Sequence, residues 1–65
     1  MYILKVKGSS SIPDYIQVRD DDFTLIAYFK ANDPERSIKK SNLESYSQKI
    51  IEAINSSPYG KITKI

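Results

Sequence analysis

The chain has 65 residues, a formal net charge of +2, and neither cysteine nor histidine. These features exclude disulfides, thiolate or imidazole metal ligands, and catalysis by cysteine or histidine. The length predicts one domain, residues 1–65, near the lower limit for a fold stabilised by its core alone. The missing disulfides favour a reducing, cytoplasmic setting. No stretch approaches the roughly 20 apolar residues of a membrane span, and Lys5 and Lys7 argue against a signal peptide.

Residues 2–7 alternate between two sets of side chains, which predicts a first strand. One side is apolar and is expected to face the core: Tyr2, Leu4 and Val6. The other side is expected to face outward: Ile3, Lys5 and Lys7. Residues 8–14 contain glycine, serines and proline, so we expect a loop. This loop either closes over a partner or only connects two strands.

Residues 15–19 and 23–31 also alternate, and they predict a hairpin with the turn Asp20-Asp21-Asp22. The apolar side of this hairpin is expected to form the core: Ile16, Val18, Phe23, Leu25, Ala27 and Phe29. Aspartates suit a solvated turn because they accept local backbone hydrogen bonds. A calcium site is the alternative, but the glycine and distal glutamate of an EF-hand are missing, so we expect no metal.

Residues 32–36 end the third strand, because proline cannot donate to a β-ladder. Residues 37–40 are either a short extended piece or the approach to a helix. Ser41 and Glu44 have the spacing of a capping box, so we expect a helix from Ser41 to about Asn55. Side chains spaced three and four residues apart give this helix one apolar stripe: Leu43, Tyr46, Ser47, Ile50, Ile51 and Ile54.

Residues 56–60 contain proline and glycine and are expected to turn the chain. Residues 61–65 are basic and partly β-branched, which is typical of an edge strand. The predicted fold class is therefore α+β with the order β-β-β-α-β. One amphipathic helix packs on one face of a small antiparallel or mixed sheet.

The sequence shows no recognisable catalytic machinery. The acids of residues 20–22 and those at Asp33 and Glu35 bracket the third strand, so they lie about 25 Å apart at the usual rise per residue. No serine has a histidine to activate it, and Gly8 and Gly60 are isolated rather than part of a phosphate-binding loop. We expect the chain to be no enzyme and to need no cofactor.

The outward side of the three strands is the expected contact surface, because it mixes aromatic residues with cations and carries no carboxylate. The residues expected to bind are Lys5, Tyr15, Arg19, Ile26, Tyr28 and Lys30. A protein partner is expected first, which makes the chain an accessory protein that docks on or links a larger assembly. Single-stranded nucleic acid is an alternative, although the net charge is small. A homo-oligomer formed through the first or last strand is another.

Three segments together extend over nearly the whole chain: the opening Tyr-Ile-Leu-Lys-Val-Lys-Gly of residues 2–8, the helix from Leu43 to Ile54, and the closing Gly-Lys-Ile-Thr-Lys-Ile of residues 60–65. In these segments the chain resembles the small phycobilisome linker domain of the CpcD type. The resemblance implies a non-enzymatic plug or spacer that fits against pigment–protein rings. The Val-Pro-Tyr segment of that domain is replaced here by residues 27–29, and its arginine-rich helix is missing.

A second similarity involves three segments, which are residues 15–20, residues 25–34 and the following helix. In these segments the chain is similar to the single-strand-binding transcriptional positive cofactor family. This similarity covers about two-thirds of the chain and implies a nucleic-acid-binding sheet. The glycine-lysine turn of that family is replaced by Asp20-Asp21-Asp22.

Overall fold

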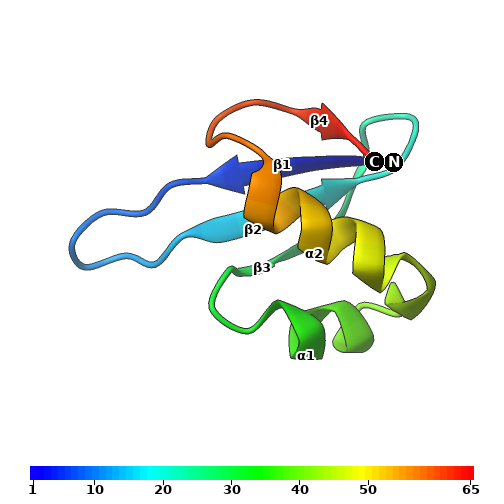
Figure 1. Cartoon of the computed structure of the whole chain (residues 1–65), viewed down its shortest axis with the longest axis horizontal. Coiled ribbons are helices and arrows are strands. Elements are labelled where there is room, and N and C mark those ends of the chain that lie inside the picture. Colours follow the sequence, from blue (N-terminus) through cyan, green and yellow to red (C-terminus); the bar gives the residue numbers. More distant parts are fainter.

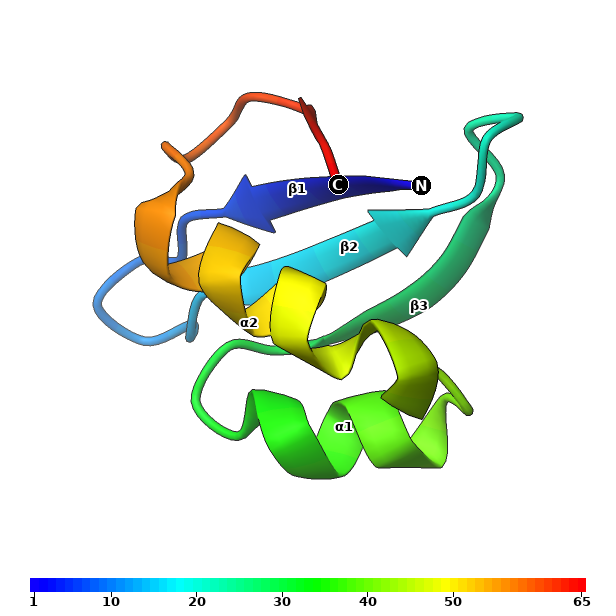
Figure 2. The same ribbon diagram turned by 45° about the vertical axis from the view of Figure 1, so that its right-hand side comes forward.

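A computed structural model describes residues 1–65 and contains one four-stranded antiparallel sheet with helices on one of its faces (Figures 1 and 2). The strands are β1 (Tyr2–Val6), β2 (Tyr15–Arg19), β3 (Leu25–Lys30) and β4 (Thr63–Lys64), in the spatial order β3-β2-β1-β4. The helices are α1 (Pro34–Lys40) and α2 (Ser47–Ser56), and a single 3₁₀ turn, η1 (Glu44–Tyr46), precedes α2. The predicted α+β class and the order β-β-β-α-β are confirmed.

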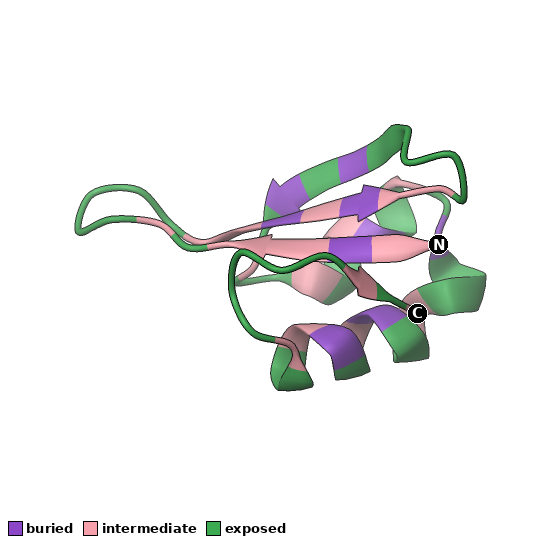
Figure 3. Ribbon diagram, turned by 90° about the horizontal axis from the view of Figure 1, so that it is seen from above, coloured by how far each residue is buried: buried purple, intermediate pink, exposed green.

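The hydrophobic core lies between the sheet and the two helices. Its buried side chains are Ile3, Ile16, Val18, Ala27, Phe29, Ile38, Leu43, Ile50 and Ala53. Buried and exposed residues alternate along β3, as Figure 3 shows, because successive strand side chains point to opposite faces. Each fully buried isoleucine contributes about 1.5–3 kcal/mol by leaving water. The β2 alternation and the placing of Ile50 in the core are confirmed.

The predicted orientation of β1 is wrong. Ile3 pairs with Val18, and directly opposed residues share one face of a sheet, so Ile3 lies under the helices. Its side chain is 1% exposed. Lys5 lies on the same side as Ile3, while the alternate residues of β1 point to the face that no helix covers. The sequence pattern did not determine the orientation of β1, because both sides of this strand carry apolar residues.

A β-bulge removes Leu25 from the predicted core. Val18 pairs with Ala27, whereas Arg19 pairs with Leu25, so β3 carries the additional residue Ile26 at this point. A bulge changes the alternation of the strand that contains it. The Leu25 side chain is therefore 45% exposed, on the face of Arg19.

Phe23 is also not a core residue. It precedes β3 in the 20–24 turn, at a positive φ of 64°, and its side chain is 50% exposed. The hairpin turn is thus longer than Asp20-Asp21-Asp22, and β3 begins at Leu25 rather than at residue 23.

The helix predicted from Ser41 to about Asn55 is shorter in the structure, where α2 covers Ser47–Ser56, and a further helix, α1, forms at Pro34–Lys40, where the end of a strand and either an extended piece or the approach to a helix were expected. Pro34 starts α1, and its missing N–H costs nothing there because the first N–H groups of a helix have no partner within the helix. Ile38 of the same helix is buried in the core. The capping box predicted at Ser41 does not form. Ser41 instead ends α1, and Asn42 follows with a φ of 59°, a left-handed conformation that terminates helices. Helix α2 consequently begins only at Ser47.

Ile50→Ala is expected to lower the free energy of unfolding by about 2–5 kcal/mol, because Ile50 is fully buried and its truncation leaves a cavity. Leu25→Ala is the matched control, since the same kind of truncation at an exposed site costs less than about 1 kcal/mol. Urea denaturation of both variants measures the difference. Equal losses would contradict the positions assigned to the two residues.

Candidate functional site

The sheet face that no helix covers is the candidate binding surface, and we call it the outward face. Strand pairing arranges most of it in three rows across the sheet. The rows are Lys30–Tyr15–Val6, then Tyr28–Gln17–Leu4, then Leu25–Arg19–Tyr2–Lys64. The exposed side chains of Ile26, at the bulge, and Phe23, in the adjoining turn, complete the outward face. Aromatic and aliphatic residues predominate, and none of its residues is acidic.

Two aromatic stacks organise the outward face. The ring centroids of Tyr15 and Tyr28 are 4.8 Å apart with an interplanar angle of 25°. Those of Tyr2 and Phe23 are 4.5 Å apart at 24°. Stacked rings of this kind attract one another beyond their buried area and restrict side-chain freedom. The stacks therefore hold large apolar surfaces in defined positions on the outward face.

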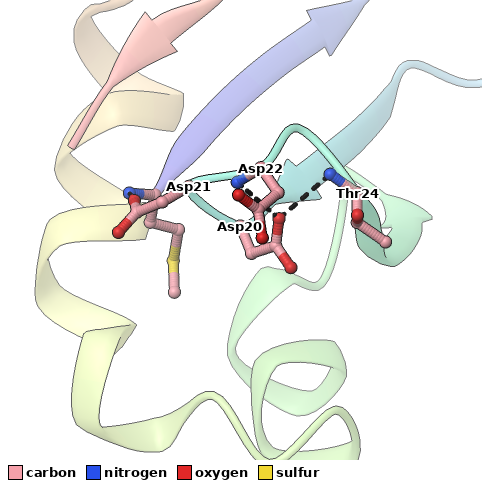
Figure 4. Close-up of polar contacts among 5 residues, drawn as sticks. Asp20, Asp21, Asp22 and Thr24 are labelled. Atoms are coloured by element: carbon pink, nitrogen blue, oxygen red, sulfur yellow. Dashed lines mark hydrogen bonds and ion pairs between the residues drawn. The ribbon is translucent and has the colours of Figure 1, made fainter.

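The turn between β2 and β3 holds Phe23 in an unfavourable backbone conformation. Its φ of 64° is uncommon for a bulky residue and costs on the order of 1–2 kcal/mol. The Asp20 carboxylate Oδ1 accepts the backbone N–H groups of Asp22 at 2.9 Å and Thr24 at 3.0 Å (Figure 4). The Phe23 N–H donates to the Asp20 carbonyl at 3.0 Å. These bonds stabilise the turn that places the Phe23 ring on the outward face.

Arg19 is fixed on the outward face by two hydrogen bonds. Its Nη1 donates to the Phe23 carbonyl at 2.8 Å, and its Nη2 donates to Gln17 Oε1 at 3.0 Å. The ion pairs of the structure join other residues, so no carboxylate neutralises Arg19 or Lys30. A guanidinium carries five N–H donors, and these two bonds leave others free.

The acidic turn uses its carboxylates locally. Asp20 accepts hydrogen bonds from backbone N–H groups of the turn, whereas Asp21 points away from them and accepts a hydrogen bond from the N-terminal amine of Met1 (Figure 4). That hydrogen bond, the charge of the amine and the nearby Lys64 lower the pKa of Asp21. Nowhere in the chain do acidic side chains gather into a group that could hold a metal ion.

Lys5 does not belong to the outward face, contrary to the sequence prediction. Its Nζ donates to the carbonyls of Ile54 at 2.6 Å and Ser57 at 3.0 Å, at the end of α2. It also lies 4.5 Å from the centroid of the Tyr59 ring. Terminal helix carbonyls lack partners within the helix, and a lysine there satisfies them. The same ring lies 5.9 Å from the Nζ of Lys7, on the same side of the sheet.

Asp14 ties the 8–14 loop to the segment that follows α2. The Tyr59 hydroxyl donates to Asp14 Oδ2 at 2.6 Å, and the Gly8 N–H donates to Oδ1 at 2.7 Å. The bond from Tyr59 is the largest cause of the lowered pKa of Asp14, followed by the bond from Gly8 and the charges of Lys7 and Lys5. The same bond raises the pKa of Tyr59.

The remaining residues predicted to bind lie together on the outward face: Tyr15, Arg19, Ile26, Tyr28 and Lys30. Their binding role stays a prediction. Of the other members of this face, sequence reasoning missed Tyr2, Leu4, Val6, Phe23, Leu25 and Lys64. The β1 residues could have been found only from the pairing of β1 with β2, and no sequence signal indicates the bulge at Ile26.

Two shallow hollows, of about 270 and 300 Å³, open on the surface. The first lies between α2 and the β4 segment, and the second lies beside the acidic turn. Most residues of the first are polar or charged. Neither hollow includes a residue of the aromatic stacks.

Comparisons with known proteins leave the outward face to be interpreted from its own geometry. Scans of protein-family models, curated proteins and solved structures each found no match for this chain. The two family resemblances and the absence of enzymatic activity therefore stay predictions. Among the helices, none combines the length and the apolar character required to cross a membrane.

Lys5→Met is expected to lower the free energy of unfolding by about 1–3 kcal/mol, because the helix-end carbonyls of Ile54 and Ser57 lose their donor. Methionine keeps the apolar length of the side chain, so packing changes little. Lys30→Met is the matched control, since Lys30 is exposed and makes no hydrogen bond through its side chain. Urea denaturation compares the variants, and an equal effect of both would contradict this role of Lys5.

Tyr59→Phe is expected to raise the pKa of Asp14 toward 3.8, because the hydroxyl stabilises the ionised carboxylate. Wild type should therefore have a larger free energy of unfolding than this variant above pH 3.8. The difference should shrink as the pH falls below 3.8 and Asp14 becomes protonated. At the alkaline end the difference shrinks as Tyr59 ionises, above its ordinary pKa of 10.0. Titration of the Asp14 carboxyl carbon by NMR measures the pKa.

Tyr46→Phe serves as the control for this titration, because Tyr46 is exposed and its hydroxyl makes no hydrogen bond. An unchanged Asp14 pKa in Tyr59→Phe would show that the Gly8 N–H and the lysines alone determine it.

Proposed function

We propose that this chain is a small non-enzymatic docking module that binds a protein partner through the outward face. The observation that carries the proposal is the composition of that face: stacked aromatic rings, aliphatic side chains and no carboxylate. Protein interfaces are enriched in tyrosine, phenylalanine and arginine and depleted of charge at their centres. Contiguous apolar patches on single domains are often functional.

The conformation of Phe23 supports a docking role. A glycine or asparagine would adopt the φ of 64° at lower cost, and neither would expose a ring to water. The strained residue instead extends the aromatic surface beside Tyr2. Strained backbone is retained more often where a residue has a functional task than where it only connects strands.

The positions of the lysines favour protein over nucleic acid. A surface for single strands needs a basic groove that follows the phosphates, with aromatic rings beneath the bases. Lys5 and Lys7 lie on the other side of the sheet, next to Tyr59. The cations left on the outward face are Arg19, Lys30 and Lys64, and they lie at its ends rather than in one groove.

The same charges favour a different protein over a second copy of this chain. If two copies met through their outward faces, the cations of both would be enclosed without any carboxylate. Unpaired charges at an interface cost several kcal/mol. A partner that carries carboxylates avoids this cost.

A photo-cross-linking amino acid in place of Tyr28 tests the proposal, because Tyr28 is 54% exposed in the middle row of the face. Tyr46 is the matched control, since it is a 43% exposed tyrosine outside the face. After irradiation in an extract of the cells that encode the chain, we expect a discrete adduct from position 28 only. Protease should degrade it and nuclease should leave it intact.

Leu4→Lys in the same cross-linking protein places a charge in the middle row, so it should remove the adduct. Equal adducts from positions 28 and 46 would contradict the proposal. An adduct that nuclease degrades would support the nucleic-acid alternative, as would oligonucleotide binding that weakens steeply with salt.

A further inference from the structure

The dimensions of the outward face match those of one α-helix. Two gaps between neighbouring strands give β1, β2 and β3 a combined width of about 10 Å. The five residues of β1 or β2 give a length of about 17 Å. An α-helix with its side chains is about 10–12 Å across, and three turns are about 16 Å long. The helices of the chain itself cover only the opposite face (Figure 2).

Two unpaired cations, Arg19 and Lys30, lie at opposite ends of this area, and Lys64 lies beside it on β4. Lys30 belongs to the first row of the outward face, and Arg19 belongs to the third row on the neighbouring strand. Four residues along a strand and one strand across correspond to about 14 Å. The middle row, which contains Tyr28, is uncharged. The face is thus uncharged in its centre and positive at both ends of its long direction.

Arg19 is prepared to bind a carboxylate. Its guanidinium is already positioned by the Phe23 carbonyl and by Gln17, so little side-chain freedom remains to be lost when a partner binds. Its free N–H donors match the two oxygens of a carboxylate. Lys30 is a flexible point charge that can follow a partner over several ångströms.

We infer that the partner presents an amphipathic α-helix of at least three turns, with its apolar side on the outward face. The helix carries two carboxylates on one side, one for Arg19 and one for Lys30. Residues seven or eleven positions apart share one side of a helix and lie about 10 or 16 Å apart. These spacings bracket the separation of the two cations. The inference rests on the proposed function and names its partner.

Titration of the ¹⁵N-labelled protein with synthetic helical peptides of about 18 residues tests the inference. One peptide has a leucine stripe flanked by two glutamates seven positions apart, and its matched control has lysines in place of the glutamates. We expect the acidic peptide to bind at about 10–100 µM and to shift the amide signals of Leu4, Gln17 and Tyr28. The basic peptide should bind at least about tenfold more weakly.

Lys30→Glu should reduce this preference at least about threefold or reverse it, because the charge at one end of the face changes sign. Lys39→Glu is the matched control, since Lys39 is exposed on α1 and lies outside the face. Equal binding of the two peptides, no binding of either, or signal shifts confined to α1 and α2 would overturn the inference.

The two tests fail separately. A protein adduct at position 28 combined with equal or absent binding of the acidic and basic peptides would leave the docking function standing and reject the acidic helix. Absence of an adduct at position 28 would reject both the docking function and the inference.

Discussion

The backbone pairing of Ile3 with Val18 determines which residues of β1 are buried and which face outward. A 65-residue chain has few large side chains to bury, and this pairing puts Ile3 into the core. A shift by one residue would reverse every side chain of β1. With Ile3 inside, Lys5 meets the carbonyls at the end of α2. Tyr2, Leu4 and Val6 must then face outward, so the composition of the outward face follows from the burial of Ile3.

The sequence was sufficient for features that depend on local periodicity. Alternation along residues 15–19 predicted the buried side of β2, and helical spacing placed Ile50 in the core. The orientation of β1 depended instead on its partner strand and on the carbonyls that receive Lys5, which come from a segment distant in sequence. The predicted helix boundaries were wrong for a different reason. Asn42 in a left-handed conformation separates two helices, and this outweighed the capping box at Ser41.

Part of the outward face was likewise predictable. Tyr15, Arg19 and Tyr28 follow directly from the alternation of β2 and β3. The contributions of Leu25 and Phe23 were not predictable, because a bulge and a positive φ interrupt that alternation. The segment contains no glycine, which is the usual sequence signal for such irregularities. The outward face in the structure is consequently more apolar and less basic than the sequence predicted. This difference favours the proposed protein partner over nucleic acid.

The bulge at Ile26 also affects how the molecule behaves in a crowded cell. An apolar edge strand with a regular free edge is a template for fibril growth, since further chains can add to it by backbone hydrogen bonding. In β3 the bulge interrupts that regularity at Ile26, the second of the six residues of the strand. Each molecule can therefore expose a largely apolar sheet face and still resist polymerisation along the edge formed by β3.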